Sequence, residues 1–253
     1  MLCNKYCNIR KWLIKCVKKN QKCGFIVCFR FVSTWLLLIE LYISESEILV
    51  YIHGGYWQQL SRDVSSYIVE PLYKSGFKVI VIGYDLCPVV TMPEIVAEIQ
   101  RAFQYCINYA KLHKSSGISV AGHSAGAHLA ASMFNLTKTE DIFRDFYLIS
   151  GIYNLQPLVG TFVNNALMMS LSTATSLSPQ LSNISVCAKV HVIVGEFDSP
   201  AFKEQSKKFH EKLQELHVKT EFMMIEKMDH FDIVENLNCS DYELIKLILR
   251  QKI

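Results

Sequence analysis

The sequence predicts an α/β fold in which a doubly wound, mostly parallel sheet carries helices on both faces. Short runs of β-branched and aromatic residues alternate with stretches of helical periodicity over residues 47–253. In the run 78–82 the β-branched residues follow one another without a polar interruption, as in a strand buried on both faces. Over Met92–Leu112 the apolar residues recur with helical spacing, which is typical of an amphipathic helix that covers such a sheet.

The remaining elements follow from the same two patterns. Apolar, β-rich runs predict strands at Ile48–Ile52, 78–82, 118–121, 146–149, 190–194 and Thr220–Ile225. Helical spacing predicts helices at 64–75, Met92–Leu112, directly after Ser124, and at 202–216 and 242–249. Residues 152–187 are rich in Ser, Thr, Asn and Leu with weak periodicity, and we expect them to form excursion or lid helices over the functional site.

Length and composition indicate a soluble globular protein. A chain of 253 residues with 51% hydrophobic and 19% charged residues suits one large domain. The formal net charge of +3 arises from a basic leader, residues 5–22, which precedes every acidic residue. Because the rest of the chain shows no basic stripe, we expect no nucleic-acid partner.

Cysteine usage indicates a reducing compartment. Five of the nine cysteines lie within the first 28 residues, and the others are scattered. An odd number of cysteines with irregular spacing is not typical of a disulfide framework. The sequence also lacks the paired C-x-x-C motif with histidines that would indicate a zinc site. We therefore expect reduced cysteines, no metal site and a cytoplasmic protein.

A nucleophile elbow is predicted at Ser124. The motif Gly122-His123-Ser124-Ala125-Gly126 follows an apolar run and precedes small, helix-favouring residues. Strand, sharp turn and helix are the context in which G-x-S-x-G indicates a nucleophile, and the order is that of an α/β hydrolase. The serine sits in a strained conformation there, and the two glycines leave room for neighbouring backbone.

Two later strand ends supply an acid and a base. Asp198 follows the strand at 190–194 and His230 follows Thr220–Ile225, which gives the order Ser, Asp, His expected of α/β hydrolases. A histidine can take the serine proton near neutral pH, and a carboxylate can hold the imidazole in the required tautomer. Glu196 is the alternative acid on the same loop.

A glycine turn predicts an oxyanion hole. His53-Gly54-Gly55-Tyr56-Trp57 follows the strand Ile48–Ile52. Such a turn can direct N–H groups at a developing oxyanion, so Gly54, Gly55 and the N–H of Ala125 are the predicted donors. We expect His53 to brace the loop and His128 to be a packed, hydrogen-bonded residue.

These motifs together resemble a known family. His-Gly-Gly-Tyr-Trp, Gly-Tyr-Asp-Leu-Cys-Pro, Gly-His-Ser-Ala-Gly-Ala-His-Leu, Ser-Gly-Ile-Tyr-Asn-Leu and Asp-His-Phe-Asp-Ile-Val-Glu are similar to motifs of the animal kynurenine formamidases (arylformamidases), which are α/β hydrolases. The resemblance runs from about residue 48 to the C-terminus. It implies hydrolysis of N-formyl-L-kynurenine to L-kynurenine and formate in tryptophan catabolism, without metal or cofactor.

Motif matching places the triad on Ser124, Asp198 and His230 and the oxyanion loop on Gly54 and Gly55. An aryl formamide has an aromatic leaving amine, so an aromatic-lined mouth is expected, formed by Tyr56, Trp57 and Tyr153.

The N-terminal segment departs from this family. Residues 1–46 do not resemble its lead-in, and residues 24–43 are apolar apart from Arg30 and Glu40. A signal anchor is the minority interpretation, because a mid-membrane charge costs about 2.5–3.5 kcal/mol. A second interpretation is that the segment forms buried strands, or a helix packed on the sheet edge. A third interpretation is that the segment is not a well-evolved part of the fold. We therefore divide the chain into an atypical segment, 1–46, and a catalytic α/β-hydrolase domain, 47–253.

Other functions remain open at this level. A general carboxylesterase would use the same residues, and a family member impaired by its N-terminus would retain them. A non-catalytic hydrolase-fold protein is the third alternative, although such proteins usually lose the nucleophile or the histidine. The sequence is compatible with a homodimer but does not determine the oligomeric state.

Overall fold

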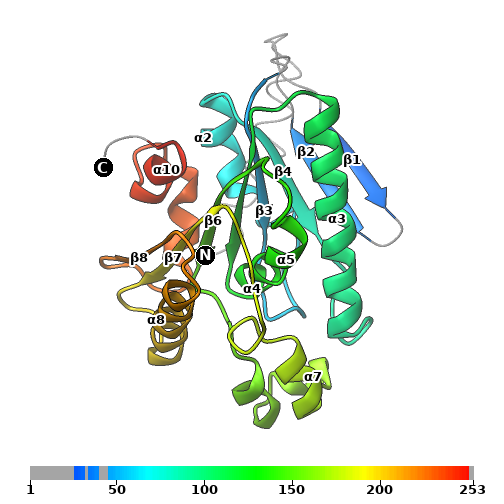
Figure 1. Ribbon diagram of the computed structural model, residues 1–253, viewed down its shortest axis with the longest axis vertical. Coiled ribbons are helices and arrows are strands. Elements are labelled where there is room, and N and C mark those ends of the chain that lie inside the picture. Colours follow the sequence, from blue (N-terminus) through cyan, green and yellow to red (C-terminus); the bar gives the residue numbers. More distant parts are fainter. Residues whose placement is uncertain (1–25, 32–33, 40–44, 251–253) are drawn as a thin grey trace.

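An eight-stranded β-sheet forms the centre of the structure, a computed structural model that describes residues 26–31, 34–39 and 45–250 (Figure 1). The strands lie in the order β1-β2-β4-β3-β5-β6-β7-β8. Their bounds are β1 Ile26–Phe31, β2 Thr34–Ile39, β3 Ile48–Ile52, β4 Lys78–Gly83, β5 Ile118–His123, β6 Phe143–Ile149, β7 Lys189–Gly195 and β8 Thr220–Ile225.

The first two strands extend this sheet at one edge. β1 pairs antiparallel with β2, and β2 pairs antiparallel with β4, with Leu37 opposite Val81. For the apolar segment 24–43 the sequence left several alternatives open, one of which was strands at the sheet edge. Residues 26–31 and 34–39 form such strands. Residues 1–25, where the basic leader lies, are outside the described residues. No helix in the described part of the chain is long and apolar enough to span a membrane.

The other strands are parallel, and the direction in which the chain adds strands to the sheet reverses at β3. β3 pairs with β4 on one side and with β5 on the other, with Val50 opposite both Ile80 and Val120. The chain thus adds β4 in one direction and β5 to β8 in the other. In an open α/β sheet, ligands bind beyond the carboxyl ends of the strands at such a reversal. The loops after β3 and β5 meet there, and they carry the predicted oxyanion turn and elbow.

Helices cover both faces of the sheet. Residues of β3 alternate between the two cores: Ile48, Val50 and Ile52 belong to one, and Leu49 and Tyr51 belong to the other. The first core is covered by helices α3 (Met92–Leu112), α4 (Ala125–Ala131), α5 (Phe134–Thr137) and α8 (Pro200–Glu215). The second is covered by α2 (Val69–Lys74), α9 (Asp232–Glu235) and α10 (Glu243–Ile248).

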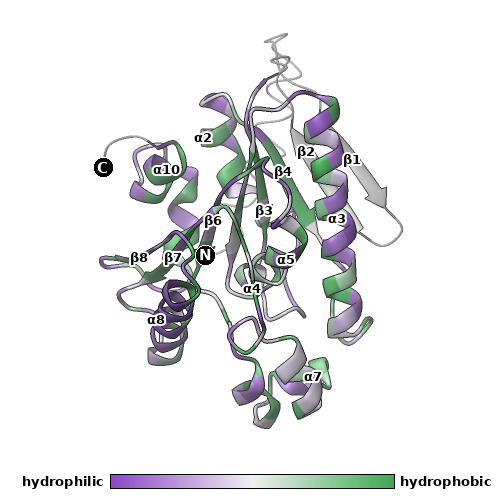
Figure 2. Ribbon diagram, in the orientation of Figure 1, coloured by the Kyte–Doolittle hydropathy of each residue, from purple (hydrophilic) through white to green (hydrophobic). Residues whose placement is uncertain are grey.

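The hydrophobic layers agree with this doubly wound arrangement. Figure 2 shows hydrophobic colour along the central strands and hydrophilic colour along α8. The strand order, with six parallel strands and helices on both faces, is that of the doubly wound, mostly parallel sheet, and the predicted fold class is confirmed.

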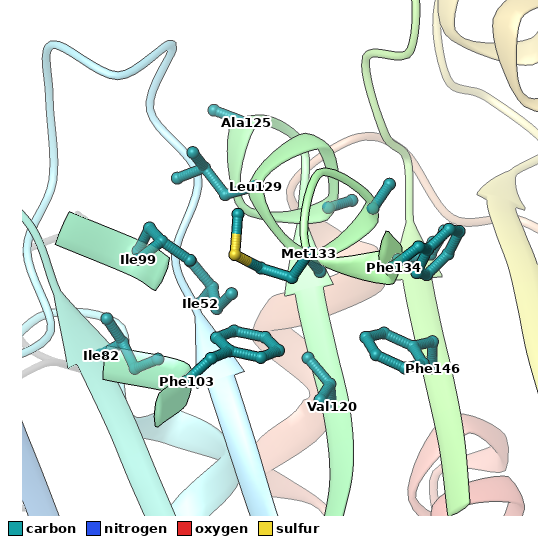
Figure 3. Close-up of a cluster of buried hydrophobic side chains, with 14 of the residues drawn as sticks. Ile52, Ile82, Ile99, Phe103, Val120, Ala125, Leu129, Met133, Phe134 and Phe146 are labelled. Carbon is teal, nitrogen blue, oxygen red and sulfur yellow. The ribbon is translucent and has the colours of Figure 1, made fainter. Parts of the chain in front are cut away.

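The helix after the elbow is held by the first core. Leu129 and Met133, at the end of α4 and just beyond it, lie in the same cluster of buried side chains as Ile52 and Val120 of the sheet (Figure 3). All of these side chains are buried. The position of the elbow is thus set by apolar packing rather than by the turn alone.

Some predicted elements differ from the structure. β6 begins at Phe143 rather than at residue 146, because Phe143 pairs with Ile118 although the polar Arg144 and Asp145 interrupt the apolar run. The helix expected at 64–75 is a 3₁₀ turn, Ser66–Ile68, continued by α2. α8 begins earlier than predicted, at Pro200, where the Ser199 side chain caps it.

Gly126 offers a test of this packing. An added Cβ would lie 2.6 Å from the carbonyl oxygen of His53 and closer still to that of Ile52. We expect Gly126→Ala to lower the free energy of unfolding by about 2–4 kcal/mol, because backbone atoms must move. Urea denaturation followed by circular dichroism measures this. Gly160→Ala is the control, since a Cβ there meets nothing within 4 Å; equal stability of the two variants would contradict the prediction.

Candidate active site

Ser124 occupies the sharp turn between β5 and α4. Its φ of 55° and ψ of −116° lie outside the regions that non-glycine residues favour. The strain is supported by close packing, since a Cβ on Gly122 would collide with the carbonyl of Gly126. Ser124 is 2% exposed and lines a pocket. The elbow therefore has the geometry that the sequence predicts.

Asp198 and His230 are joined across the ends of β7 and β8. The His230 Nδ1 lies 3.1 Å from both carboxylate oxygens of Asp198. This contact requires Nδ1–H as donor, which leaves Nε2 as the proton acceptor of the neutral ring. Ser124 and His230 line the same pocket. The structure thus brings the three predicted residues to one end of the sheet.

The carboxylate of Asp198 is held in its ionised form. Burial raises the pKa of Asp198, but hydrogen bonds from His230 and from the N–H of Ser199 outweigh burial and hold that pKa below its ordinary value. Glu196, the alternative acid, lies elsewhere: its Oε2 accepts the N–H of Lys227 at 2.8 Å. The contact with His230 therefore belongs to Asp198.

His123 contacts His230 as well, which the sequence analysis did not predict. The His123 Nε2–H donates to the backbone carbonyl of His230 at 2.9 Å, and the two ring centroids are 4.6 Å apart. Burial, followed by the proximity of His230, lowers the pKa of His123 to about 3. A neutral ring on β5 thus ties the loop after β8 to the elbow. Its place beside the nucleophile in G-x-S-x-G was the available signal.

The glycine turn after β3 lies against the elbow. A Cβ on Gly54 would lie 3.1 Å from the Cβ of Ser124 and 3.0 Å from the carbonyl oxygen of His123. Gly55 has a φ of +100° and lines the same pocket as Ser124. Ala125 is the first residue of α4, where backbone N–H groups have no partner within the helix. These three predicted donors are adjacent to the nucleophile.

The ring of His53 braces this turn, as expected. Its Nδ1 donates to the carbonyl of Gly54 at 2.9 Å, and its ring stacks on Tyr84 with centroids 4.3 Å apart. The Tyr84 hydroxyl donates to the carbonyls of His53 and Gly54 at 3.0 and 3.2 Å. Burial lowers the pKa of His53 to about 4, so the brace is uncharged near neutral pH.

His128 is a packed residue, also as expected. It is fully buried, and its Nε2–H donates to the carbonyl of Leu177 at 2.7 Å. The Trp57 ring meets it edge-on at 4.9 Å. Burial lowers the pKa of His128 to about 4. This side chain therefore anchors the segment 152–187 to α4.

A cavity of about 580 Å³ opens above Ser124 and His230. Aromatic side chains on its wall come from Tyr56, Tyr67 and Phe231. The expectation that residues 152–187 cover the site is wrong in one respect, because none of them lines this cavity. They pack beside the glycine turn instead, where Gln58 donates to the Val163 carbonyl at 3.2 Å.

Two of the three predicted aromatic contacts need correction. Tyr56 lines the cavity, but Trp57 and Tyr153 are fully buried behind it and do not. Trp57 packs against His128, and Tyr153 stacks on Phe209 with centroids 4.1 Å apart. Both rings belong to the first hydrophobic core. Loops have no regular periodicity, so the sequence does not reveal which of their aromatic residues face the core and which face the cavity.

Metal-ligating groups were not expected. Within the described ranges, no group of three or more His, Cys, Asp or Glu side chains is arranged to hold a metal ion.

The fold and the elbow define an α/β hydrolase. An esterase from Pyrobaculum calidifontis superposes with a TM-score of 0.78 at 19% identity, covering 99% of this chain and 93% of its own. The BD-FAE family model matches residues 42–150.

Curated relatives are more specific. A zebrafish (Danio rerio) kynurenine formamidase is 35% identical over 227 residues, which are 84% of this chain and 76% of the relative. A Drosophila melanogaster kynurenine formamidase is 30% identical over 230 residues, covering 83% and 76%. The chain belongs to the kynurenine formamidase family, as the motifs indicate.

The buried histidines predict how stability varies with pH. His53, His123 and His128 bind protons in the folded state only near pH 3–4, whereas an unfolded histidine has a pKa of about 6.5. Between these values the unfolded state binds more protons, so stability falls as pH decreases from about 6.5 to about 4.

We expect His128→Gln to flatten this dependence by up to about 1.4 kcal/mol per pH unit, because one such proton is removed while the amide can still reach Leu177. Urea titrations at several pH values between 4 and 8 measure the slope. An unchanged slope would contradict the lowered pKa of His128.

Proposed function

We propose that this chain hydrolyses N-formyl-L-kynurenine to L-kynurenine and formate, with Ser124 as nucleophile, His230 as base and Asp198 as the group that orients the base. One observation carries the proposal: Ser124 and His230 line one cavity while the Nδ1 of His230 is held by Asp198 at 3.1 Å. Membership of the kynurenine formamidase family supports the choice of substrate.

The first half of the reaction transfers the formyl group to the enzyme. The Ser124 Oγ attacks the formyl carbon while the Nε2 of His230 takes the hydroxyl proton. The resulting oxyanion accepts hydrogen bonds from the N–H groups of the glycine turn and of Ala125. When the tetrahedral intermediate collapses, the C–N bond breaks and His230 returns the proton to the leaving aryl amine.

The second half regenerates the serine. A water molecule loses a proton to His230 and attacks the formyl ester on Ser124. The ester C–O bond then breaks, formate leaves and the proton returns to the Ser124 oxygen. Throughout the cycle Asp198 stabilises the imidazolium, which is consistent with a carboxylate whose pKa is held low by its hydrogen bonds despite the burial that opposes them.

The cavity suits an aryl leaving group. Its volume of about 580 Å³ and its walls from Tyr56, Tyr67 and Phe231 fit a single substituted ring. The formyl group is small, so little space is needed on the other side of the nucleophile. An aryl formamide thus matches the shape of the site.

A cytoplasmic location is part of the same proposal. Cys87, Cys106, Cys187 and Cys239, the cysteines within residues 45–250, all have free thiols. Free thiols agree with a reducing compartment.

Ser124→Ala is expected to remove hydrolysis of N-formyl-L-kynurenine, lowering kcat by about 10⁴-fold or more because no covalent intermediate forms. Appearance of the product's aryl amine by absorbance measures this. Parallel assays with p-nitrophenyl acetate separate the functions: turnover of the ester but not of the formamide by the unmutated chain would favour a carboxylesterase.

Asp198→Asn is expected to lower kcat by about 10⁴-fold, because an amide favours the wrong imidazole tautomer. Glu196→Gln is the matched control on the same loop, and its rate should change by less than about threefold since Glu196 contacts Lys227 instead. Steady-state kinetics on both proteins measure the difference. A larger loss in the Glu196 variant would move the acid to that residue.

A further inference from the structure

Rings from other segments pack against the imidazole of His230. The Phe202 ring lies against it with a centroid separation of 4.2 Å and an interplanar angle of 36°. His123 lies at 4.6 Å and 45°, and Phe231 meets the imidazole edge-on at 5.4 Å. Phe202 is the nearest of these by centroid distance, and it belongs to α8 rather than to the loops of the site.

Phe202 is not part of the cavity wall. Ser124, His230 and Phe231 are among the residues that line the cavity, whereas Phe202 is not. Its side chain is partly buried and packs against the first hydrophobic core. A change at this position therefore acts on the base rather than on a bound substrate.

The start of α8 holds the Phe202 ring and the Asp198 carboxylate together. The Ser199 side chain caps the helix by accepting the N–H of Phe202, and the N–H of Ser199 donates to the Asp198 Oδ1 at 2.9 Å. The Lys203 Nζ donates to the backbone carbonyl of Glu196 at 3.1 Å, which ties the same turn to the loop after β7. The acid and the ring that contact the base are thus placed by one helix start.

The hydrogen bond to Asp198 leaves the plane of the imidazole undetermined. Both carboxylate oxygens lie 3.1 Å from the Nδ1 of His230, so they hold that nitrogen, but rotation about the Cβ–Cγ bond of a histidine has broad minima. A ring packed at 4.2 Å restricts this rotation because its atoms are in van der Waals contact with the imidazole. The plane decides where Nε2 lies relative to the Ser124 hydroxyl, whose proton it must reach.

We propose that Phe202 is a positioning residue of the hydrolytic reaction, which holds the imidazole of His230 in the plane that directs Nε2 at Ser124. The ring acts through the base and makes no contact with the substrate. This inference rests on the proposed function, since it concerns the same base. It gives the first turn of α8 a role in the reaction in addition to covering the sheet.

Phe202→Leu tests the proposal, because it keeps an apolar side chain and removes the flat ring. We expect kcat for N-formyl-L-kynurenine to fall by about 10–100-fold, since a tilted base is misaligned with the nucleophile. Affinity, measured by calorimetry in a Ser124→Ala background, should change by less than about twofold, because the ring is outside the cavity wall. Phe202→Tyr, which restores the ring, should recover kcat to within about threefold of the unmutated chain.

Phe197→Leu is the matched control. Phe197 lies on the loop just before Asp198, is 64% exposed and is not among the residues that line the cavity. The same substitution there should change kcat by less than about threefold. The proposal would be overturned if Phe202→Leu had no larger effect than the control, if it weakened binding instead of lowering kcat, or if Phe202→Tyr restored nothing.

Reaction of Ser124 with diisopropyl fluorophosphate separates this proposal from the proposed function. The serine oxygen displaces fluoride from phosphorus and needs the same base, whatever the natural substrate is. The rate constant of this labelling does not depend on the fraction of protein that is folded, and it should fall about tenfold or more in Phe202→Leu.

Two results distinguish the failures. Slower labelling of Phe202→Leu, together with no hydrolysis of N-formyl-L-kynurenine by the unmutated chain, would support the positioning role and contradict the proposed substrate. Hydrolysis by the unmutated chain, together with equal labelling rates of the two proteins, would support the function and contradict the positioning role.

Discussion

The close approach of two backbones at the carboxyl end of the sheet is the constraint on which the site depends. Gly126 of α4 packs on the carbonyls that end β3, and Gly54 of the turn after β3 packs on Ser124. A Cβ at Gly126 would require backbone atoms to move, and a Cβ at Gly54 would fit only if its neighbours shifted by a few tenths of an ångström. Ser124 and the glycine turn are therefore placed relative to each other by backbone contact, and apolar packing of α4 on the sheet maintains that contact.

Three neutral, buried histidines hold the loops around the site by hydrogen bonds to backbone carbonyls. His53 braces the glycine turn, His123 reaches the backbone of His230, and His128 reaches Leu177 of the excursion. In each case burial lowers the ring pKa, so the hydrogen bond is made by an uncharged ring, and His123 places no positive charge beside His230. The hydrogen bonds between these loops and the expected loss of stability in acid thus have the same origin.

Local patterns predicted most of the fold and the residues of the candidate site. Most of the parallel strands were found because β-branched runs mark strands buried on both faces, and Ser124, Asp198 and His230 were found because each follows a predicted strand. One boundary was wrong because pairing with a neighbour overrides composition: Phe143 begins β6 despite two polar residues after it. For the apolar segment before residue 45 the sequence left several alternatives open, and pairing with β4 decides for two antiparallel edge strands.

The sequence by itself determined the class of fold, the residues at the strand ends and the family, because these depend on local order along the chain. Only the tertiary structure decided which side chains face the cavity. Trp57 and Tyr153 proved to be core residues, whereas Tyr67, Asp232 and Glu235 line the site. The burial of a side chain and the charge of a cavity depend on segments that are far apart in the sequence, so no local sequence pattern predicts them.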